Sequence, residues 1–212
     1  MLARLRISVP DRPGMLGRVA SAIGQAGGDI VRVAVLDSEG GRATDDVHVE
    51  VRDAEHVARV SDALSAVVGL TVTAVQHPVP PASGHADLEL LAQVLQRPER
   101  ALITLVDGAP AALAADWAAA VRYVAGDPHE VVALSHQCPG PEFVAVRAAL
   151  RLSAVRIVPP GRATPYVGAA LVPLQDDLAL VLVREEGPEY HPWELWRLEQ
   201  VGRIAGTALP HA

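Results

Sequence analysis

The chain has 212 residues, 50% of them hydrophobic, with 18 basic and 25 acidic side chains and a formal net charge of −7. The acidic balance argues against a nucleic-acid surface, which needs a basic stripe, and the absence of lysine excludes Schiff-base and phosphate-loop lysines. One cysteine excludes an intrachain disulfide. We expect a soluble cytoplasmic protein, because no apolar stretch approaches the roughly 20 residues of a membrane span and no signal peptide is recognisable. The arginine-only basic set suggests a bacterial coding sequence.

Hydrophobic periodicity predicts six elements in the first 76 residues. Alternating residues favour strands, and apolar residues at helical spacing favour helices. The order is strand 3–9, helix 16–26, strand 30–37, strand 46–52, a helix between Asp53 and Gly69, and strand 70–75. Asp53 is expected to cap the second helix. This β-α-β-β-α-β order predicts an α+β, ferredoxin-like domain with one antiparallel sheet and two helices on one face.

The loop between the first strand and the first helix reads Asp11-Arg12-Pro13-Gly14-Met15-Leu16. Pro13 suits the first turn of a helix, and Asp11 is a good acceptor for the unpaired N–H groups of that turn. Gly14 has no Cβ, so the backbone there can approach a neighbour or a ligand. A strand that enters a helix through such a loop suits a small carboxylate. These residues alone also fit a capped turn without a ligand.

The second strand is apolar on both sides. Val31, Val33 and Val35 occupy one side by alternation, and Ile30, Ala34 and Leu36 occupy the other. Such a strand is expected to be buried on both faces. Edge-to-edge pairing of two sheets, or stacking on a second domain, would provide that burial.

The first 76 residues resemble the ACT domain, a regulatory module that binds small molecules. The resemblance is carried by the strand at 5–9, the loop Asp11–Leu16, and Gly27-Gly28-Asp29-Ile30 one helix later. It implies an amino acid bound at a dimer interface, between the loop after the first strand and the start of the second. The implied contacts are Asp11, Arg12, Pro13, Gly14, Met15, Leu16, Gly28, Asp29 and Ile30. Ionised Asp29 would accept from a ligand ammonium group.

Residues 77–85 contain three prolines in four positions and predict an extended linker. We therefore expect domains at 1–76 and 86–212. The second half predicts a helix over 86–97, a strand over 100–106 broken at Pro110, and an ambiguous alanine-rich run ending in a strand at 121–124. Further along it predicts a helix over 143–150, a short strand at 155–158, a hairpin of strands 166–174 and 178–183, and a final helix from Pro192.

The end of the chain resembles a GAF-like sensor domain. The carrying residues are Val172-Pro173-Leu174 in one strand, Leu180–Val183 in the next, and Tyr190-His191-Pro192-Trp193 at the start of the last helix. The resemblance implies an antiparallel-sheet α+β fold and dimerisation. A cyclic nucleotide, a tetrapyrrole and no ligand all remain open. Trp193 and Trp196 indicate either a second partner for this helix or partly exposed rings over a sheet edge.

No catalytic constellation, cofactor site or metal site is expected. Adjacent acids such as Asp45-Asp46 fit solvated turns, and Cys138 near His136 lacks a third orienting group. We therefore expect a non-catalytic regulatory protein that senses a free amino acid, as a homodimer, without nucleic-acid or membrane partners. The alternatives are a regulatory subunit that confers feedback inhibition on a separate biosynthetic enzyme, a dimeric scaffold that has lost its ligand, and an enzyme using Cys138 or the histidines.

Overall fold

The computed structural model describes residues 1–77, 85–124, 127–141, 155–158, 168–185 and 187–210. It divides into two compact units, Met1–Pro81 and Ala82–Ala212, and each is described by itself. Most of the expected linker, the helix expected over 143–150 and the start of the strand expected over 166–174 lie outside the described residues.

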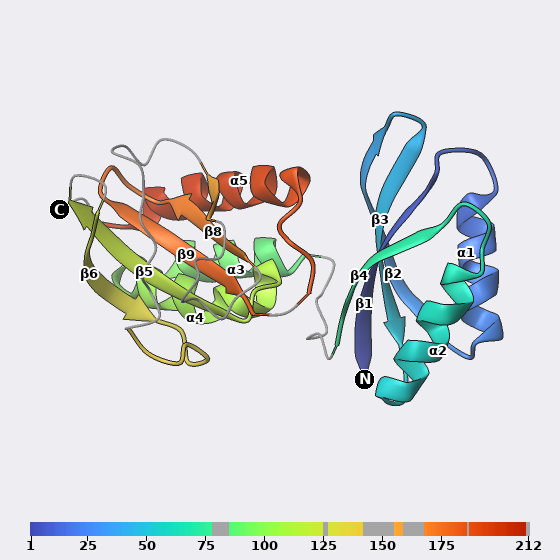
Figure 1. Ribbon diagram of the computed structural model, residues 1–212. Coiled ribbons are helices and arrows are strands. Elements are labelled where there is room, and N and C mark those ends of the chain that lie inside the picture. Colours follow the sequence, from blue (N-terminus) through green and yellow to red (C-terminus); the bar gives the residue numbers. More distant parts are fainter. Residues whose placement is uncertain (78–84, 125–126, 142–154, 159–167, 186, 211–212) are drawn as a thin grey trace. The chain divides into compact units, whose positions relative to one another are not determined.

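The N-terminal unit is a four-stranded antiparallel sheet with two helices on one face (Figure 1). The strand order is β2-β3-β1-β4, which confirms the ferredoxin-like arrangement. The elements are β1 (Leu2–Pro10), α1 (Met15–Gln25), β2 (Asp29–Glu39), β3 (Arg42–Glu50), α2 (Ala54–Ser65) and β4 (Thr71–Gln76).

The interior of this unit consists of aliphatic side chains, because no aromatic residue precedes Trp117 in the sequence. Alternate residues of β1 and β3 point at the helices, and the apolar stripes of α1 and α2 close over them. The buried set includes Ala3, Leu5, Ile7, Val9, Val19, Ile23, Val47, Val49, Val60 and Leu64.

The start of α2 is fixed by two polar side chains. The carboxylate of Asp53 accepts from the backbone N–H of His56 at 2.8 Å, which confirms the expected cap. His56 is itself buried, and its Nδ1 accepts from the N–H of Arg52 at 3.2 Å. The proton then lies on Nε2, which donates to the carbonyl of Ala26 at 3.0 Å. This histidine therefore joins the end of α1 to the start of α2.

The edge strand β2 departs from strict alternation. Its pairing with β3 shifts register after Ile30 and again after Val35. Because paired residues share a face, Ile30, Val33 and Val35 all lie on the helix-facing side, which corrects the expected grouping. Val31, Val33 and Val35 are 59%, 39% and 55% exposed, so β2 presents uncovered valines at the sheet edge.

In its described residues the C-terminal unit contains a five-stranded antiparallel sheet of order β6-β5-β9-β8-β7 and three α-helices. The expected hairpin is confirmed by the pairing of β8 with β9. The elements are α3 (Ala86–Gln96), a 3₁₀ turn (Pro98–Arg100), α4 (Ala101–Leu113), β5 (Trp117–Val124), β6 (Asp127–Leu134), β7 (Arg156–Val158), β8 (Gly168–Pro173), β9 (Leu178–Arg184) and α5 (Pro192–Ala208).

The strand expected over 100–106 is wrong, because Arg100 ends the 3₁₀ turn and residues 101–106 belong to α4. Leu105, Ala109 and Leu113 recur every four residues and face one buried cluster. Pro110 lies inside the helix and does not end it. The β-branched pair Ile103-Thr104 and the proline both argued against a helix in the sequence, whereas tertiary packing of the apolar face favours one.

Both faces of the central strands of this sheet carry buried side chains. Helices α3, α4 and α5 pack on the face that includes Ala118, Ala170 and Leu180. The opposite face forms a second cluster that includes Trp117, Leu171 and Val181. The described part of the unit is therefore an α+β fold with an apolar sheet interior on two sides, as a continuous apolar strand sequence predicts.

Helix α5 approaches this sheet closely at Gly206 and is joined to it by a buried charge. A Cβ on Gly206 would lie 2.1 Å from the carbonyl oxygen of Leu174, so only glycine permits this approach. Arg184 at the end of β9 is fully buried, and it donates to Glu194 Oε1 at 2.6 Å and to the Ala114 carbonyl at 2.7 Å. Its guanidinium also lies over the Tyr190 ring, 3.8 Å from the centroid.

Candidate ligand-binding site

A pocket of about 360 Å³ lies between the β1–α1 loop and the helix-facing side of the N-terminal sheet. Its floor includes Val9, Val35, Ala43 and Asp45, and the pairs Val9–Ala43 and Val35–Asp45 show that these residues share one face. The structure brings six of the nine expected contact residues together around this pocket: Asp11, Arg12, Pro13, Gly14, Met15 and Leu16.

The loop turns into α1 through a backbone conformation that requires glycine. Gly14 is the residue before the helix and has φ +90°, and a Cβ there would meet no atom within 4 Å. Glycine therefore permits the left-handed turn, and no neighbouring atom of the chain approaches closely here, while close approach of a ligand stays a prediction. The expected cap is also wrong, because α1 has no side-chain cap and Asp11 instead accepts from Ser38 Oγ at 2.5 Å.

The first turn of α1 leaves two backbone donors available, one on Leu16 in the pocket lining and one on the next residue, Gly17. The N–H of Met15 bonds to the carbonyl of Arg12, and the N–H of Arg18 bonds to that of Gly14. The N–H groups of Leu16 and Gly17 have no acceptor among the described residues. These two donors and the positive end of the helix dipole favour an anionic group at this position.

Asp45 is the feature of this pocket that sequence reasoning missed. Its side chain lies among apolar neighbours, the residue is 1% exposed, and Oδ1 has no hydrogen-bond partner among the described residues. Burial raises the pKa of this carboxyl above its usual value of 3.8, and the nearby charges of Asp46 and Asp11 act in the same direction. An acidic group held without a counter-charge is suited to receive a cation.

The two adjacent acids Asp45 and Asp46 are not the solvated turn residues that the sequence suggested. Both lie within β3, and neighbouring positions of a strand point to opposite faces. Asp46 accepts from Arg6 Nε at 2.7 Å and from Arg6 Nη2 at 2.8 Å on the face away from the helices. Asp45 lies opposite Ile7 of β1 and so faces the helices, a placement that is known only once the register of the strands is known.

The structure does not bring the other three expected residues to this pocket within one chain. Asp29 pairs with Glu50 at one end of β3, whereas Pro10 pairs with Arg42 at the other end. Eight residues of extended strand correspond to about 26 Å. Gly28 also has a packing role, because a Cβ there would lie 2.7 Å from Val49.

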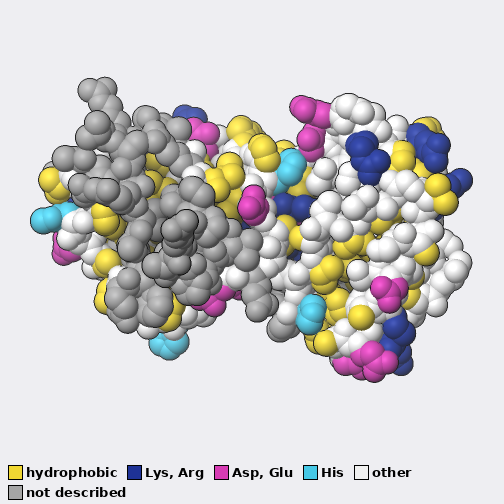
Figure 2. All heavy atoms as spheres, in the orientation of Figure 1, with side chains coloured by type: hydrophobic (Ala, Val, Ile, Leu, Met, Phe, Trp, Pro, Cys, Tyr) yellow, Lys and Arg dark blue, Asp and Glu magenta, His cyan; other side chains and the backbone are white. Residues whose placement is uncertain are grey.

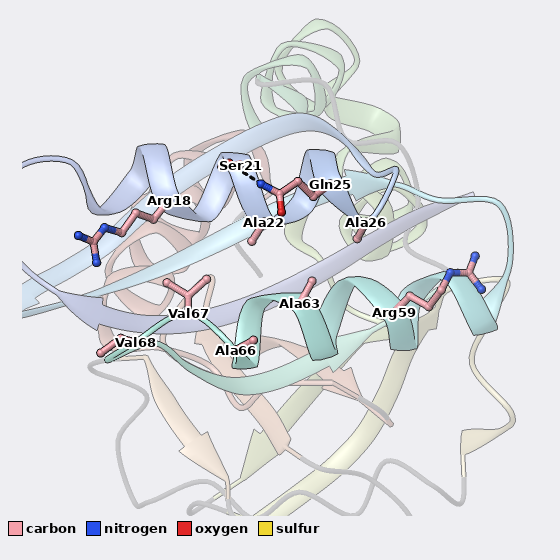
Figure 3. Close-up of a pocket in the computed structure, with 10 residues that line it drawn as sticks. All are labelled: Arg18, Ser21, Ala22, Gln25, Ala26, Arg59, Ala63, Ala66, Val67 and Val68. Atoms are coloured by element: carbon pink, nitrogen blue, oxygen red, sulfur yellow. Dashed lines mark hydrogen bonds between the residues drawn. The ribbon is translucent and has the colours of Figure 1, made fainter.

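The described residues that line two further hollows include no buried polar side-chain atom without a hydrogen-bond partner. One, of about 600 Å³, runs between α1 and α2, where Figure 3 shows Arg18 and Arg59 pointing outward at its two ends and alanines along its floor. None of its described lining residues holds a buried, unpartnered polar atom. The other, of about 940 Å³, lies in the C-terminal unit between the β8–β9 turn and α5.

Other chemical groups are dispersed over the described residues. Basic and acidic side chains form small separate groups on the face of the N-terminal unit that Figure 2 presents, rather than one basic stripe. Within the described ranges no group of three His, Cys, Asp or Glu side chains could hold a metal ion, and no helix is long and apolar enough to cross a membrane. Cys138 is half-buried and donates to the Gly140 carbonyl at 3.5 Å.

Comparisons with known proteins identify the N-terminal unit. Residues 1–73 match the sequence model of the ACT domain. The ACT domain of a GTP pyrophosphokinase from Chlorobium tepidum is 22% identical, covers 36% of this chain and 95% of its own length, and superposes with a TM-score of 0.30. No curated protein matches the chain.

Two further solved structures are similar to larger parts of the chain. The GAF domain of a protein described as a sensor histidine kinase from Pseudomonas syringae pv. tomato is 18% identical, covers 57% of this chain and 83% of its own length, and has a TM-score of 0.45. The regulatory subunit of aspartate kinase from Thermus thermophilus is 12% identical, covers 98% and 91%, and has a TM-score of 0.30. Residues 1–73, about a third of the chain, thus match the ACT domain.

Proposed function

We propose that this chain is a regulatory sensor of a free amino acid, which binds in the pocket beneath the β1–α1 loop. The observation that carries the proposal is that all six residues from Asp11 to Leu16 line one pocket, which also contains the unpaired carboxyl of Asp45. The amino acid carboxylate would accept from the N–H groups of Leu16 and Gly17. The apolar residues Val9 and Val35 would contact its side chain.

A second copy of the chain would complete the site. β2 is an edge strand of its sheet and carries exposed valines, which another apolar edge could cover. In an antiparallel pair the start of one strand lies beside the end of the other. Pairing of two β2 strands would therefore bring Gly28, Asp29 and Ile30 of the second copy beside Ser38 and the loop of the first. This arrangement would bring all nine expected ligand-contact residues to one site, six from one copy and three from the other.

The test is a thermal unfolding screen of the full chain with each of the twenty standard amino acids. Far-UV circular dichroism is the appropriate probe, because all three tryptophans lie in the C-terminal unit and report little on the pocket. A ligand at 100 times its dissociation constant stabilises the folded state by about 2.7 kcal/mol, a shift of several degrees. We expect at least one amino acid to produce this shift.

Two variants and a control locate the effect. Gly14→Val places a branched side chain at φ +90°, and Asp29→Ala removes the carboxylate expected from the second copy, so both should reduce the shift. Gly24→Ala lies in the same helix with no atom within 4 Å of the new Cβ and should keep it. If none of the twenty amino acids shifts the transition, the proposal is wrong and the loop is only a turn.

A further inference from the structure

The N-terminal pocket contains an asymmetric set of charges. Asp11 and Asp45 both line it, and Arg12 is the basic residue among its described lining residues. The Asp11 carboxylate has a partner in Ser38, whereas Oδ1 of Asp45 has none. Arg42, the basic residue closest along β3, is held elsewhere, because it donates to Ser8 Oγ and to the carbonyls of Ser8 and Gly69.

The position of Asp45 directs its side chain toward the pocket. It pairs with Ile7 on one side and Val35 on the other, so it lies on the helix-facing side of the sheet with the rest of the pocket floor. An ionised carboxylate in such apolar surroundings is unfavourable unless a cation or several donors meet it. No described side chain supplies either.

We propose that Asp45 is the residue that recognises the protonated amine of the bound amino acid. This inference rests on the proposed function and deepens it, since it assigns one pole of the ligand to a residue on β3 of the same chain rather than to Asp29 of a second copy. The amine donates to Asp45, and the carboxylate meets the unpaired N–H groups at the start of α1.

This assignment sets the chemical class of the ligand. The two poles of a zwitterion are satisfied within one pocket, at opposite walls formed by α1 and β3. A carboxylic acid without an amine, or an anion such as phosphate, would leave Asp45 unpaired and would be repelled by it. The remaining lining, which includes Val9, Val35 and Met15, suits an aliphatic side chain.

The test compares an amino acid with its counterpart that lacks the amine, in the full chain, by isothermal titration calorimetry. The first pair is L-leucine and 4-methylpentanoate; if another amino acid gives the larger thermal shift, that amino acid and its deaminated acid replace them. We expect the wild type to bind the amino acid at least about tenfold more tightly than the deaminated acid, as a charge-assisted hydrogen bond provides. In Asp45→Asn this preference should fall to about twofold or less.

Two matched variants separate Asp45 from other carboxylates. Asp62→Asn removes an exposed aspartate of α2 and should bind as the wild type does. Asp29→Asn should keep the preference for the amine even where overall affinity falls. If Asp45→Asn keeps the full preference, or Asp29→Asn removes it, the assignment is wrong while the proposed function stands. If no amino acid binds the wild type, the proposed function fails and this assignment fails with it.

Discussion

Each unit of the chain contains a buried charged side chain whose surroundings differ from those of the other. Arg184 has hydrogen-bonding partners, whereas Asp45 has a buried oxygen without one. Arg184 in the C-terminal unit is 0% exposed, and it is surrounded by a carboxylate, backbone carbonyls and an aromatic ring. Asp45 in the N-terminal unit is 1% exposed, and its buried oxygen has no described partner. Removing one partner of a paired buried charge is strongly destabilising, whereas a buried charge without a partner is itself a cost in stability.

This difference in partners indicates that Arg184 has a structural role and Asp45 a functional one. Arg184 ties the end of β9 to the turn after α4 and to the first turn of α5, so its partners are all supplied by the chain. Asp45 lines a pocket whose other wall is a helix start with unpaired N–H groups. In our proposal its partner arrives only with the ligand. Substitutions at the two positions should therefore change stability with opposite signs.

The largest expected effect is the loss of Arg184. Arg184→Met removes the buried cation that bonds to the partly buried Glu194 carboxylate and to the Ala114 carbonyl, and should lower the free energy of unfolding of the C-terminal unit by about 3–5 kcal/mol. Urea denaturation followed by tryptophan fluorescence measures this unit, because Trp117, Trp193 and Trp196 all lie in it.

Arg122→Met is the matched control for that substitution. Arg122 bonds to Asp177 at 2.6 Å, but the two side chains are 28% and 46% exposed. Its loss should therefore change the free energy of unfolding by less than about 1 kcal/mol. Equal losses in the free energy of unfolding for Arg184→Met and Arg122→Met would contradict the claim that burial makes the Arg184 contacts the more important ones.

Asp45→Asn should have the opposite sign in the ligand-free chain. The substitution removes a buried unpaired charge and should raise the free energy of unfolding at pH 7 by about 1 kcal/mol. Urea denaturation followed by both far-UV circular dichroism and tryptophan fluorescence measures this effect, because the fluorescence identifies the C-terminal transition and the remaining circular dichroism change belongs to the N-terminal unit. A large loss of stability would show that Asp45 has a structural partner and would contradict its assignment to a ligand.

The same group should give the N-terminal unit a particular pH dependence. The folded pKa of Asp45 is raised, so the native state holds this proton more tightly than the unfolded state. Its stabilising contribution is present below pH 3.8 and is lost as pH rises through the raised pKa. The stability advantage of Asp45→Asn over wild type should therefore grow with pH across this window. A difference that stays constant with pH would contradict the raised pKa.

The smallest effect tests the backbone around Arg184. Ala114 has φ +54° and is the one non-glycine residue with positive φ in the described ranges, and its carbonyl accepts from Arg184. Glycine relieves the left-handed strain but adds freedom to the unfolded chain. Ala114→Gly should therefore raise the stability of the C-terminal unit by only about 0.5 kcal/mol. A decrease in thermal or urea stability would mean that the alanine side chain contributes packing that outweighs the strain.

The sequence was sufficient to predict the order of the N-terminal elements and the loop that lines the pocket. Alternation in β1 and helical spacing in α1 are local patterns, and the loop from Asp11 to Leu16 is contiguous. Asp45 was missed because its environment depends on its partners across the sheet, Ile7 and Val35. Such pairings depend on register, and the bulges in β2 cannot be inferred from alternation.

In the C-terminal unit the misassigned helix has a similar cause. The apolar run over 101–113 is compatible with either a strand or a helix until the packing of its buried face is known. The role of Arg184 also depends on contacts that join residues far apart in sequence, such as Ala114 and Glu194. Long-range partners of this kind leave no local pattern.

The most direct test of the amino-acid pocket is an amide chemical-shift titration of the isotopically labelled full chain with the amino acid that gives the largest thermal shift. We predict that the largest changes occur at the amides of Gly14 to Gly17 and of Ala43 to Asp45, and that they saturate together. Changes centred instead on the groove between α1 and α2, or on the hollow beside α5, would show that the ligand binds elsewhere and would contradict the proposed site.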